Sequence, residues 1–307
     1  MLVIIVVLGD KVFVAFTMDC ERIRRYSPPG GPESWELSER AIRGFVQVLE
    51  DNGLSGTFFI VPETAMRHRD LWLELKERGF ELALHYHPQS FRNGEWRDYL
   101  GGYSYEEQKM QLSEAIKDWS RALGMRPESF RPGNFSANDH TFRVLYDLGF
   151  RQGSVSSPER NLPKYKAVWV GANPYPHHVS PTNRLVEGNL EFFEIPVTVD
   201  RDKRVWNGKN ALELRVEMAE LDDHRETVDK WLQHLVENDI PIKHVVALTH
   251  NVFDYSDRMS EMRKRLEGII NYVYRFSDVY GLNVIPSTIK QIHMAVHEKD
   301  YISTKES

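Results

Sequence analysis

Acidic and histidine side chains occur in pairs, two residues apart, at two places in the sequence. Asp19 and Glu21 stand in "TMDCE", and His85 and His87 stand in "LALHYHP". In a β-strand, side chains two residues apart point to the same face. Two imidazoles and one carboxylate are a common three-ligand set for catalytic zinc, with a fourth position left for water or substrate. The two pairs therefore predict a metal site held by Glu21, His85 and His87.

Three further polar residues come at the ends of predicted strands. Arg131 and Asn134 lie in "FRPGN", and His250 ends "VVALTH". In a hydrolytic site a metal lowers the pKa of bound water and polarises a carbonyl, while a second carboxylate acts as base and a remote histidine as acid. We expect Asp19 to be the base and His250 the acid. This chemistry is metal-assisted hydrolysis of an amide or an ester.

Each of these residues also has a structural interpretation. A single acid at a strand end is usually a solvated cap or a turn former, and a histidine pair is often structural. Taken alone, Arg131 fits a salt bridge and His250 fits a packed histidine at the rim. The functional interpretation depends on their joint occurrence at strand ends, which a purely structural barrel does not require.

Strand-like and helix-like segments alternate along the chain, and this order allows the strand ends to meet. Apolar runs predict strands at residues 12–19, 56–62, 80–88, 129–132, 151–157, 190–199, 244–250 and 282–286. Helical periodicity predicts helices at 37–53, 65–79, 104–124, 138–149, 258–280 and 287–300, with one long or two shorter helices in 209–239. Seven or eight βα units without a linker indicate an α/β fold, a single-domain parallel (β/α) barrel.

We expect the barrel to cover residues 12–298, after an apolar strand or tail at 1–11 and before a polar tail at 299–307. Barrel enzymes carry their chemistry at the C-terminal ends of the strands, which is where the paired residues fall.

The composition is that of a soluble globular protein. The 307 residues are 41% hydrophobic and carry a net charge of -6, which gives no support for nucleic-acid binding. A single cysteine, Cys20, excludes an intramolecular disulfide and suits a reducing compartment. The apolar run at the start is far shorter than the roughly 20 residues that span a bilayer, and it lacks the features of a signal peptide. We expect no membrane span and a cytoplasmic protein.

The order of the motifs resembles that of the polysaccharide deacetylase family, the NodB-homology carbohydrate esterases. The family's Thr-[Phe/Tyr]-Asp-Asp motif is similar to "TMDC" (17–20), and its His-[Ser/Thr]-x-x-His motif is similar to "ELALHYHP" (81–88). Its Arg-x-Pro block is similar to "FRPGNFSAND" (130–139), which leads into "TFRVLYDLGF" (141–150). "GSVSSP" (153–158), "EFFEIPVTV" (191–199) and "VVALTHN" (245–251) complete the series.

The resemblance implies a distorted (β/α)7 barrel and metal-dependent removal of an acetyl or related acyl group. Residue by residue, Asp19 matches the catalytic base, His85 and His87 match metal ligands, and His250 matches the general acid. Arg131 matches the residue that orients the base. The implied cofactor is a divalent metal ion, for which Zn²⁺ is the first choice.

The sequence departs from the family pattern in three places. Cys20 replaces the second Asp of the first motif, and Glu21, which returns to the face of Asp19 in an extended strand, is the expected substitute ligand. The histidine motif is shorter by two residues, so its pair depends on an extended strand rather than a turn. "SVSSPER" lacks a clear counterpart of the fourth motif, which leaves the partner of Arg131 or His250 undetermined.

Aromatic residues in the loops that follow the strands suit stacking on sugar rings. We expect Trp96 and Tyr175, together with Asn134, to bind substrate, although such aromatics can also simply anchor long loops. The expected substrate is an N- or O-acylated saccharide or, as in relatives that open cyclic amides and imides, a small amide. The sequence leaves open the metal, the acyl group, the sugar and the oligomeric state, a homo-oligomer included.

Two other functions compete with this one. Metal hydrolases of the amidohydrolase and PHP types also use His-x-His, but at the end of the first strand, whereas here it ends the third. A catalytically inactive family member that binds glycan through an aromatic rim fits the altered first, second and fourth motifs. Metal content and hydrolysis of an acetyl ester distinguish these functions from a deacetylase.

Overall fold

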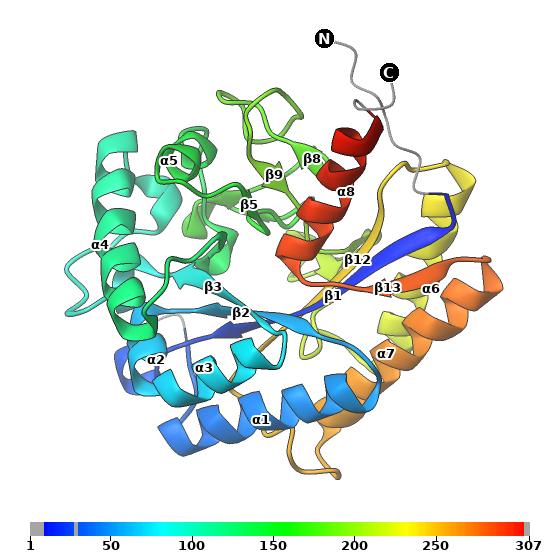
Figure 1. The fold of residues 1–307 in the computed structure, drawn as a ribbon, viewed down its shortest axis with the longest axis horizontal. Helices are drawn as coiled ribbons and strands as arrows, with labels where there is room; N and C mark the ends of the chain where they lie inside the picture. The colour runs from blue at the N-terminus through cyan, green and yellow to red at the C-terminus, as the bar shows by residue number, and fades with distance from the viewer. Residues whose placement is uncertain (1–8, 28–29, 304–307) are drawn as a thin grey trace.

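A curled, nine-stranded sheet lies at the centre of the protein in the computed structural model, which describes residues 9–27 and 30–303 (Figure 1). Its order is β12-β1-β2-β3-β4-β5-β9-β8, and β13 pairs with the first half of β1. Neighbouring strands are parallel except β8, which is antiparallel to β9. The strands of the sheet are β1 (Lys11–Cys20), β2 (Gly56–Ile60), β3 (Glu81–Tyr86), β4 (Ser129–Pro132), β5 (Gln152–Gly153), β8 (His177–His178), β9 (Phe193–Glu194), β12 (Lys243–His250) and β13 (Asn283–Pro286).

Helices surround the sheet on its outside (Figure 1). They are α1 (Trp35–Asp51), α2 (Pro62–Arg67), α3 (Arg69–Glu77), α4 (Tyr105–Leu123), α5 (Thr141–Asp147), α6 (Leu221–Glu237), α7 (Glu261–Val279) and α8 (Ile289–Ser303). Because helices cover its outer face and side chains fill its inner face, β1 is buried along its whole length after Lys11. At the start of α4, Ser104 and Glu107 form the predicted capping box, each side chain accepting a hydrogen bond from the other's backbone N–H.

Irregular backbone connects the two edges of the barrel between β9 and β12. Thr198 N donates to Val246 O at 3.1 Å, and Val216 N donates to Leu248 O at 3.0 Å. Both acceptors belong to β12, whereas both donors lie outside the main sheet. The prediction of a distorted α/β barrel is confirmed, and this irregular closure is the source of the distortion.

The prediction of helix throughout residues 209–239 is wrong for its first part. Two small antiparallel pairs accompany the barrel, β6 (Asn161–Leu162) with β7 (Ala167–Val168) and β10 (Val199–Val205) with β11 (Asn210–Glu213). Strand β11 and a segment with one bridge at Arg215 and a turn at residues 216–218 occupy the region before α6. Leu212, Leu214 and Val216 are fully buried while charged residues alternate with them, which is the period of a strand and not of a helix.

Smaller differences concern element ends. The helix predicted at 65–79 is divided into α2 and α3, which meet at His68. Helix α8 continues to Ser303, into the segment predicted as a tail, and residues 1–8 of the predicted N-terminal strand or tail lie outside the described residues. No helix in the described part of the chain is long and apolar enough to cross a membrane.

Candidate active site

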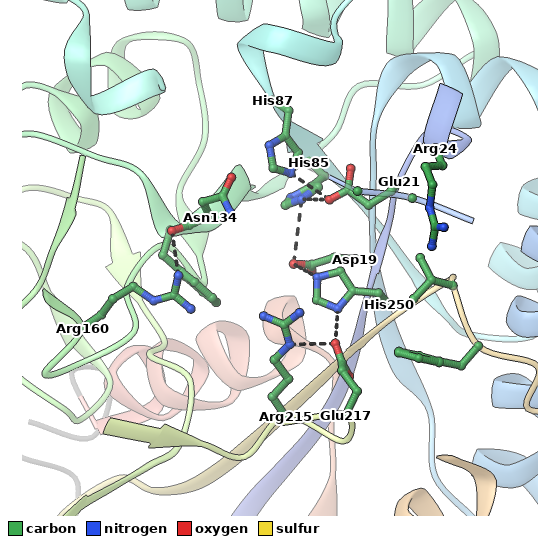
Figure 2. Close-up of a pocket in the computed structure, with 15 residues that line it drawn as sticks. Asp19, Glu21, Arg24, His85, His87, Asn134, Arg160, Arg215, Glu217 and His250 are labelled. Atoms are coloured by element: carbon green, nitrogen blue, oxygen red, sulfur yellow. Dashed lines mark hydrogen bonds and ion pairs between the residues drawn. The ribbon is translucent and has the colours of Figure 1, made fainter. Parts of the chain in front are cut away.

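The residues predicted to do chemistry meet at the C-terminal ends of four strands. In the parallel register of β1 with β12, Asp19 is paired with His250. In the register of β3 with β4, His85 is paired with Arg131. Glu21 follows the end of β1, and Figure 2 shows it directly beside the two histidines in the wall of a common cavity. The fold therefore brings together side chains that are up to 231 positions apart in number, from Asp19 to His250.

Glu21, His85 and His87 form a compact cluster of potential metal ligands. One ligand atom from each lies within 4.8 Å of the others, and all three side chains are buried. Glu21 Oε1 is 2.8 Å from His87 Nε2 and 3.3 Å from His85 Nε2. Glu21 Oε2 is buried without a hydrogen-bond partner. Since an isolated buried carboxylate oxygen is unfavourable, this arrangement suits a cation held between the three side chains.

A hydrogen bond to the backbone orients His85. Its Nδ1 donates to the backbone oxygen of Arg131 at 2.9 Å, so its Nε2 is the nitrogen that faces Glu21. A ring N–H fixed on a carbonyl oxygen is typical of histidines that bind metal. The ring of His87 lies directly on Gly133, where a Cβ would come 2.2 Å from His87 Cε1, so glycine is required there for the close approach.

Cys20 is not part of this cluster. Its side chain is fully buried, and its Sγ lies 3.8 Å from the backbone oxygen of Met18. The pKa of the thiol is raised well above its usual value by burial and by the carboxylates of Asp19 and Glu21. The thiol is therefore protonated, and it packs behind the strand end that carries the two acids.

Asp19 is held by Arg131 on one side and faces the histidines on the other. Its Oδ1 accepts from Arg131 Nη1 at 2.7 Å, and its Oδ2 lies 3.8 Å from His85 Nε2 and 3.9 Å from His250 Nε2. Burial alone would raise the pKa of Asp19, but Arg131, His85 and His250 together lower it below its usual value. Asp19 is thus a buried carboxylate with one oxygen directed into the site.

Arg131 is fully buried and fixed by several partners. Its guanidinium donates to Thr17 Oγ1 at 2.8 Å and to Ser154 Oγ at 2.9 Å, and it lies 4.1 Å over the ring of Phe59. Such a rigid fork holds a carboxylate in one orientation. The structure therefore places Arg131 where it positions Asp19.

His250 is supported by a carboxylate that the sequence analysis missed. Its Nδ1 is 2.6 Å from Glu217 Oε1, which also accepts from Arg215 Nε at 2.7 Å. The second oxygen of Glu217 accepts from Thr249 Oγ1 at 3.0 Å. Burial would raise the pKa of Glu217, but Arg215 and His250 hold it well below the usual range. The ionised Glu217 therefore fixes Nδ1 of His250 as the protonated nitrogen and directs Nε2 into the cavity.

Arg215 and Glu217 were missed because they lie in the segment predicted as helix. The signal was present in "LELRVE" (212–217), where apolar and charged residues alternate with period two. The partner of His250, undetermined from the sequence, is Glu217. Arg131 finds its partners in Asp19 and Ser154 rather than in an acid of the fourth motif.

The site opens into a cavity of about 250 Å³ that is lined mainly by polar and charged side chains (Figure 2). Asn134 lines it from the turn after β4 with a left-handed backbone, φ 56°, and its Oδ1 is buried without a partner. Arg160, which forms a buried ion pair with Glu213, donates to the backbone oxygen of Asn134 at 3.1 Å. The bond from Arg160 fixes the backbone of Asn134 at the cavity wall, and its role in substrate binding stays a prediction.

Trp96 and Tyr175, predicted to bind substrate, do not line this cavity. Trp96 packs edge-on against Tyr103 and lines a separate hollow beside α4. Tyr175 stacks on Trp231 of α6, and its hydroxyl lies 2.6 Å from His234 Nε2. Both aromatics pack against neighbouring parts of the chain outside this cavity, so a role of Trp96 and Tyr175 in substrate binding stays a prediction.

Residues 31–153 match the family model for polysaccharide deacetylase. This match confirms the resemblance to the polysaccharide deacetylase family. It includes His85, His87 and Arg131, whereas Asp19 and His250 lie outside it. Among curated proteins, no sequence matches the chain.

Solved structures confirm the fold. A protein from Mycobacterium smegmatis described as a polysaccharide deacetylase is 16% identical with a TM-score of 0.59, over 95% of this chain and 92% of that one. A protein from Pseudomonas aeruginosa PAO1 with the same description is 14% identical with a TM-score of 0.59, over 94% and 91%. Puue allantoinase is 15% identical with a TM-score of 0.59, over 93% and 90%. At these identities the likeness concerns the fold, which different activities share.

Proposed function

We propose that the protein is a metal-dependent hydrolase that removes an acetyl or related acyl group from an N- or O-acylated saccharide. One observation carries the proposal. A buried Glu-His-His cluster shares a cavity with a carboxylate, Asp19, and an imidazole, His250, each held by its own charged partner. The match to the polysaccharide deacetylase family supports acyl groups on sugars as the substrate class.

Glu21, His85 and His87 would hold the metal. Imidazole nitrogens with one carboxylate oxygen suit Zn²⁺, and the unpartnered Glu21 Oε2 fits a cation at this place. When bound, the ion would polarise the acyl carbonyl and lower the pKa of a water molecule. The remaining steps depend on protein side chains.

Asp19 would act as the general base. Its Oδ1 is occupied by Arg131, so Oδ2 is the oxygen that faces the cavity. As the water oxygen adds to the acyl carbon, Oδ2 takes a proton from that water. Because Arg131 fixes the carboxylate, the base needs no rearrangement before it reacts.

His250 would act as the general acid. Its Nε2 gives a proton to the sugar nitrogen or oxygen as the bond from that atom to the acyl carbon breaks. The imidazole is then restored by the proton that Asp19 gained, through solvent or substrate. Glu217 orients the ring through Nδ1 and stabilises the imidazolium form at the moment of transfer.

A second candidate is hydrolysis of a small cyclic amide. The cavity is about 250 Å³ and contains Arg24, Arg160 and Arg215 in its wall, while the predicted sugar-stacking residues Trp96 and Tyr175 lie elsewhere. A small, polar, charged site of this kind fits a compact amide as well as a monosaccharide. The same groups, Asp19, His250 and the metal-holding cluster, would serve both reactions.

A direct assay distinguishes these functions. Tag-free protein would be loaded with Zn²⁺ and given N-acetylated oligosaccharides, an O-acetylated saccharide and a cyclic imide in parallel. Release of acetate that is lost in Asp19→Asn supports the deacetylase, and ring opening without acetate release supports the second candidate. Glycan binding without hydrolysis, or hydrolysis that Asp19→Asn leaves unchanged, would overturn the proposal.

A further inference from the structure

The guanidinium of Arg215 is only partly used by the protein. Its Nε donates to Glu217 Oε1 at 2.7 Å, and in the described part of the chain no residue accepts a hydrogen bond from Nη1 or Nη2. An arginine has N–H donors on all three of its nitrogens. Figure 2 shows the two Nη atoms of Arg215 directed into the cavity, where the side chain is 26% exposed. Arg215 therefore presents a two-nitrogen edge to whatever occupies the cavity.

The other arginines of the cavity wall are occupied in different ways. Arg160 uses all three of its nitrogens on protein oxygens, and two of them donate to Glu213. Arg24 forms an ion pair with Glu33, and its side chain is 64% exposed, so solvent reaches its remaining donors. Arg215 thus differs from both, because its unused donors face the enclosed part of the site.

Arg215 is fixed beside the proposed acid. The Glu217 oxygen that accepts from Arg215 Nε also contacts His250 Nδ1 at 2.6 Å. The backbone of Arg215 forms a bridge to Leu248, two residues before His250 on β12. A group bound to the Nη edge of Arg215 would therefore lie next to the bond that His250 is proposed to break.

The charges around Arg215 leave one cation without a full counterpart. Burial alone would lower the pKa of Arg215, but three neighbouring carboxylates, Glu217 first, raise it, and the guanidinium stays charged. Among the described residues, Glu217 is the only acid that forms an ion pair with Arg215. The same carboxylate must also balance His250 when that ring is protonated. Because charges that are removed from water need partners, a negative group on the ligand would complete this arrangement.

We propose that Arg215 binds a carboxylate or phosphate group of the substrate, close to the acyl bond that is hydrolysed. The fork of an arginine matches two oxygens of such a group. The acids of the site do not oppose this placement, because Figure 2 shows Glu21 and the two histidines across the cavity from Arg215. This assignment rests on the proposed function, since it concerns a second part of the same substrate.

The position of Arg215 also restricts where the anionic group is attached. In a 2-acetamido sugar, the carbons next to the nitrogen-bearing carbon are C1 and C3. If His250 meets the sugar nitrogen, an anion on O1 or O3 lies on the neighbouring part of the molecule, where Arg215 is. An anion on O6 lies farther away. The predicted substrate class is therefore an acylated amino sugar with a phosphate on O1 or a carboxylate on an O3 side chain.

Four compounds that share one acetamido group test this assignment. They are the methyl glycoside of N-acetylglucosamine, N-acetylglucosamine 1-phosphate, its 3-O-carboxymethyl ether and its 6-phosphate. With Zn²⁺-loaded protein, the 1-phosphate or the 3-O-carboxymethyl compound should have a KM at least about tenfold below those of the methyl glycoside and the 6-phosphate. Whichever of the two is preferred identifies the anionic group.

Arg215→Met should remove this preference. We expect the KM of the preferred compound to rise about 10- to 100-fold, while any loss of kcat through Glu217 is the same for all four compounds. Arg97→Met, at an exposed arginine, should keep the preference. Circular dichroism checks that each variant is folded, and Arg215→Lys, which keeps the charge but not the fork, replaces the methionine variant if that one is not.

The outcomes separate this assignment from the proposed function. Hydrolysis with equal KM for all four compounds, or a preference that Arg215→Met keeps and Arg24→Met removes, would overturn the role of Arg215 and leave the hydrolase intact. If no compound releases acetate, the proposed function fails, and calorimetry of the same compounds with metal-free protein decides the role of Arg215. Tighter binding of an anionic compound that Arg215→Met abolishes supports it, and equal binding of all four overturns it.

Discussion

The two halves of the candidate active-site cavity are built differently. The base half, named for the proposed base, contains Asp19, His85 and Arg131, which are at most 4% exposed and lie on the parallel strands β1, β3 and β4. The acid half, named for the proposed acid, combines His250 of β12 with Glu217 from an irregular segment, and both are partly exposed. Regular strand ends therefore hold the proposed base and metal ligands, while irregular chain supplies the partner of the proposed acid.

Asp19→Asn should have the largest effect, because it removes the base and leaves the buried geometry nearly unchanged. We expect kcat for acyl release to fall about 10³-fold or more. Bound metal, measured in the same preparation, should remain at the wild-type level, since Asp19 is not one of the proposed ligands. More than a tenth of the wild-type rate would contradict the role of Asp19.

Arg131→Met tests how strongly the base half depends on its buried ion pair. Asp19 would be left as an unpaired buried carboxylate, so we expect a loss of about 3–5 kcal/mol in the free energy of unfolding. Urea denaturation measures this loss. Asp19→Asn in the same chain should restore part of it, and Arg97→Met, at an exposed arginine, should change stability by less than about 0.5 kcal/mol.

Glu21→Gln tests the metal cluster by removing its charge without changing its shape. We expect metal affinity to fall by more than about 100-fold, beyond the 10–100-fold typical of outer-shell changes. Competition with a chromogenic chelator gives the affinity. Cys20→Ala, one residue earlier and with its side chain packed away from the site, should keep the wild-type affinity; a similar loss in both variants would argue against Glu21 as a ligand.

Glu217→Gln tests the role of the proposed acid, His250, independently of the proposed base, Asp19. We expect kcat to fall about 10–100-fold with an N-acetylated sugar, whose amine must be protonated to leave. An aryl acetate ester has a leaving group that needs no proton. With this substrate, Glu217→Gln should change kcat little, whereas Asp19→Asn should still lower kcat about 10³-fold. If the Glu217→Gln variant loses the same fraction of kcat on both substrates, Glu217 does not act through protonation of the leaving group.

A pH-dependent effect concerns Glu194, the buried acid that ends β9. Burial raises the pKa of Glu194 to about 7, despite hydrogen bonds from Ser156 and from the backbone of Val155. The folded state therefore binds more protons than the unfolded state between the ordinary carboxyl pKa of 4.5 and about 7. Stability attributable to this group is present at low pH and declines as pH rises through that window.

Glu194→Gln removes this titration. The free energy of unfolding of the variant minus that of the wild type should therefore increase from pH 5 to pH 8. The increase should be up to about 3 kcal/mol, at 1.36 kcal/mol per pKa unit. Urea denaturation at the two pH values measures the difference. A difference between the two proteins that does not change with pH would mean that Glu194 titrates normally in the fold.

The alternation of residues along the sequence was sufficient to predict which site residues lie at the ends of the regular strands. The alternation in "TMDCE" and "LALHYHP" placed Asp19, Glu21, His85 and His87 because side chains two apart share a strand face. The pattern failed at residues 209–220, where Glu, Leu and Arg have good helix propensity but residues 210–213 pair with β10 and Arg215 bridges to Leu248 of β12. Local pattern also could not place Trp96 and Tyr175, since loop direction depends on distant packing partners.

The sequence by itself determined the barrel and the candidates for the metal ligands, the base and the acid, because period and strand order act over short stretches of chain. Only the tertiary structure decided that Glu217 supports His250, that Asn134 rather than Trp96 or Tyr175 lines the cavity, and that Arg215 directs its guanidinium into the cavity. These contacts join segments whose separation in the chain leaves no local signal. Their geometry follows from how the irregular closure packs on the finished sheet.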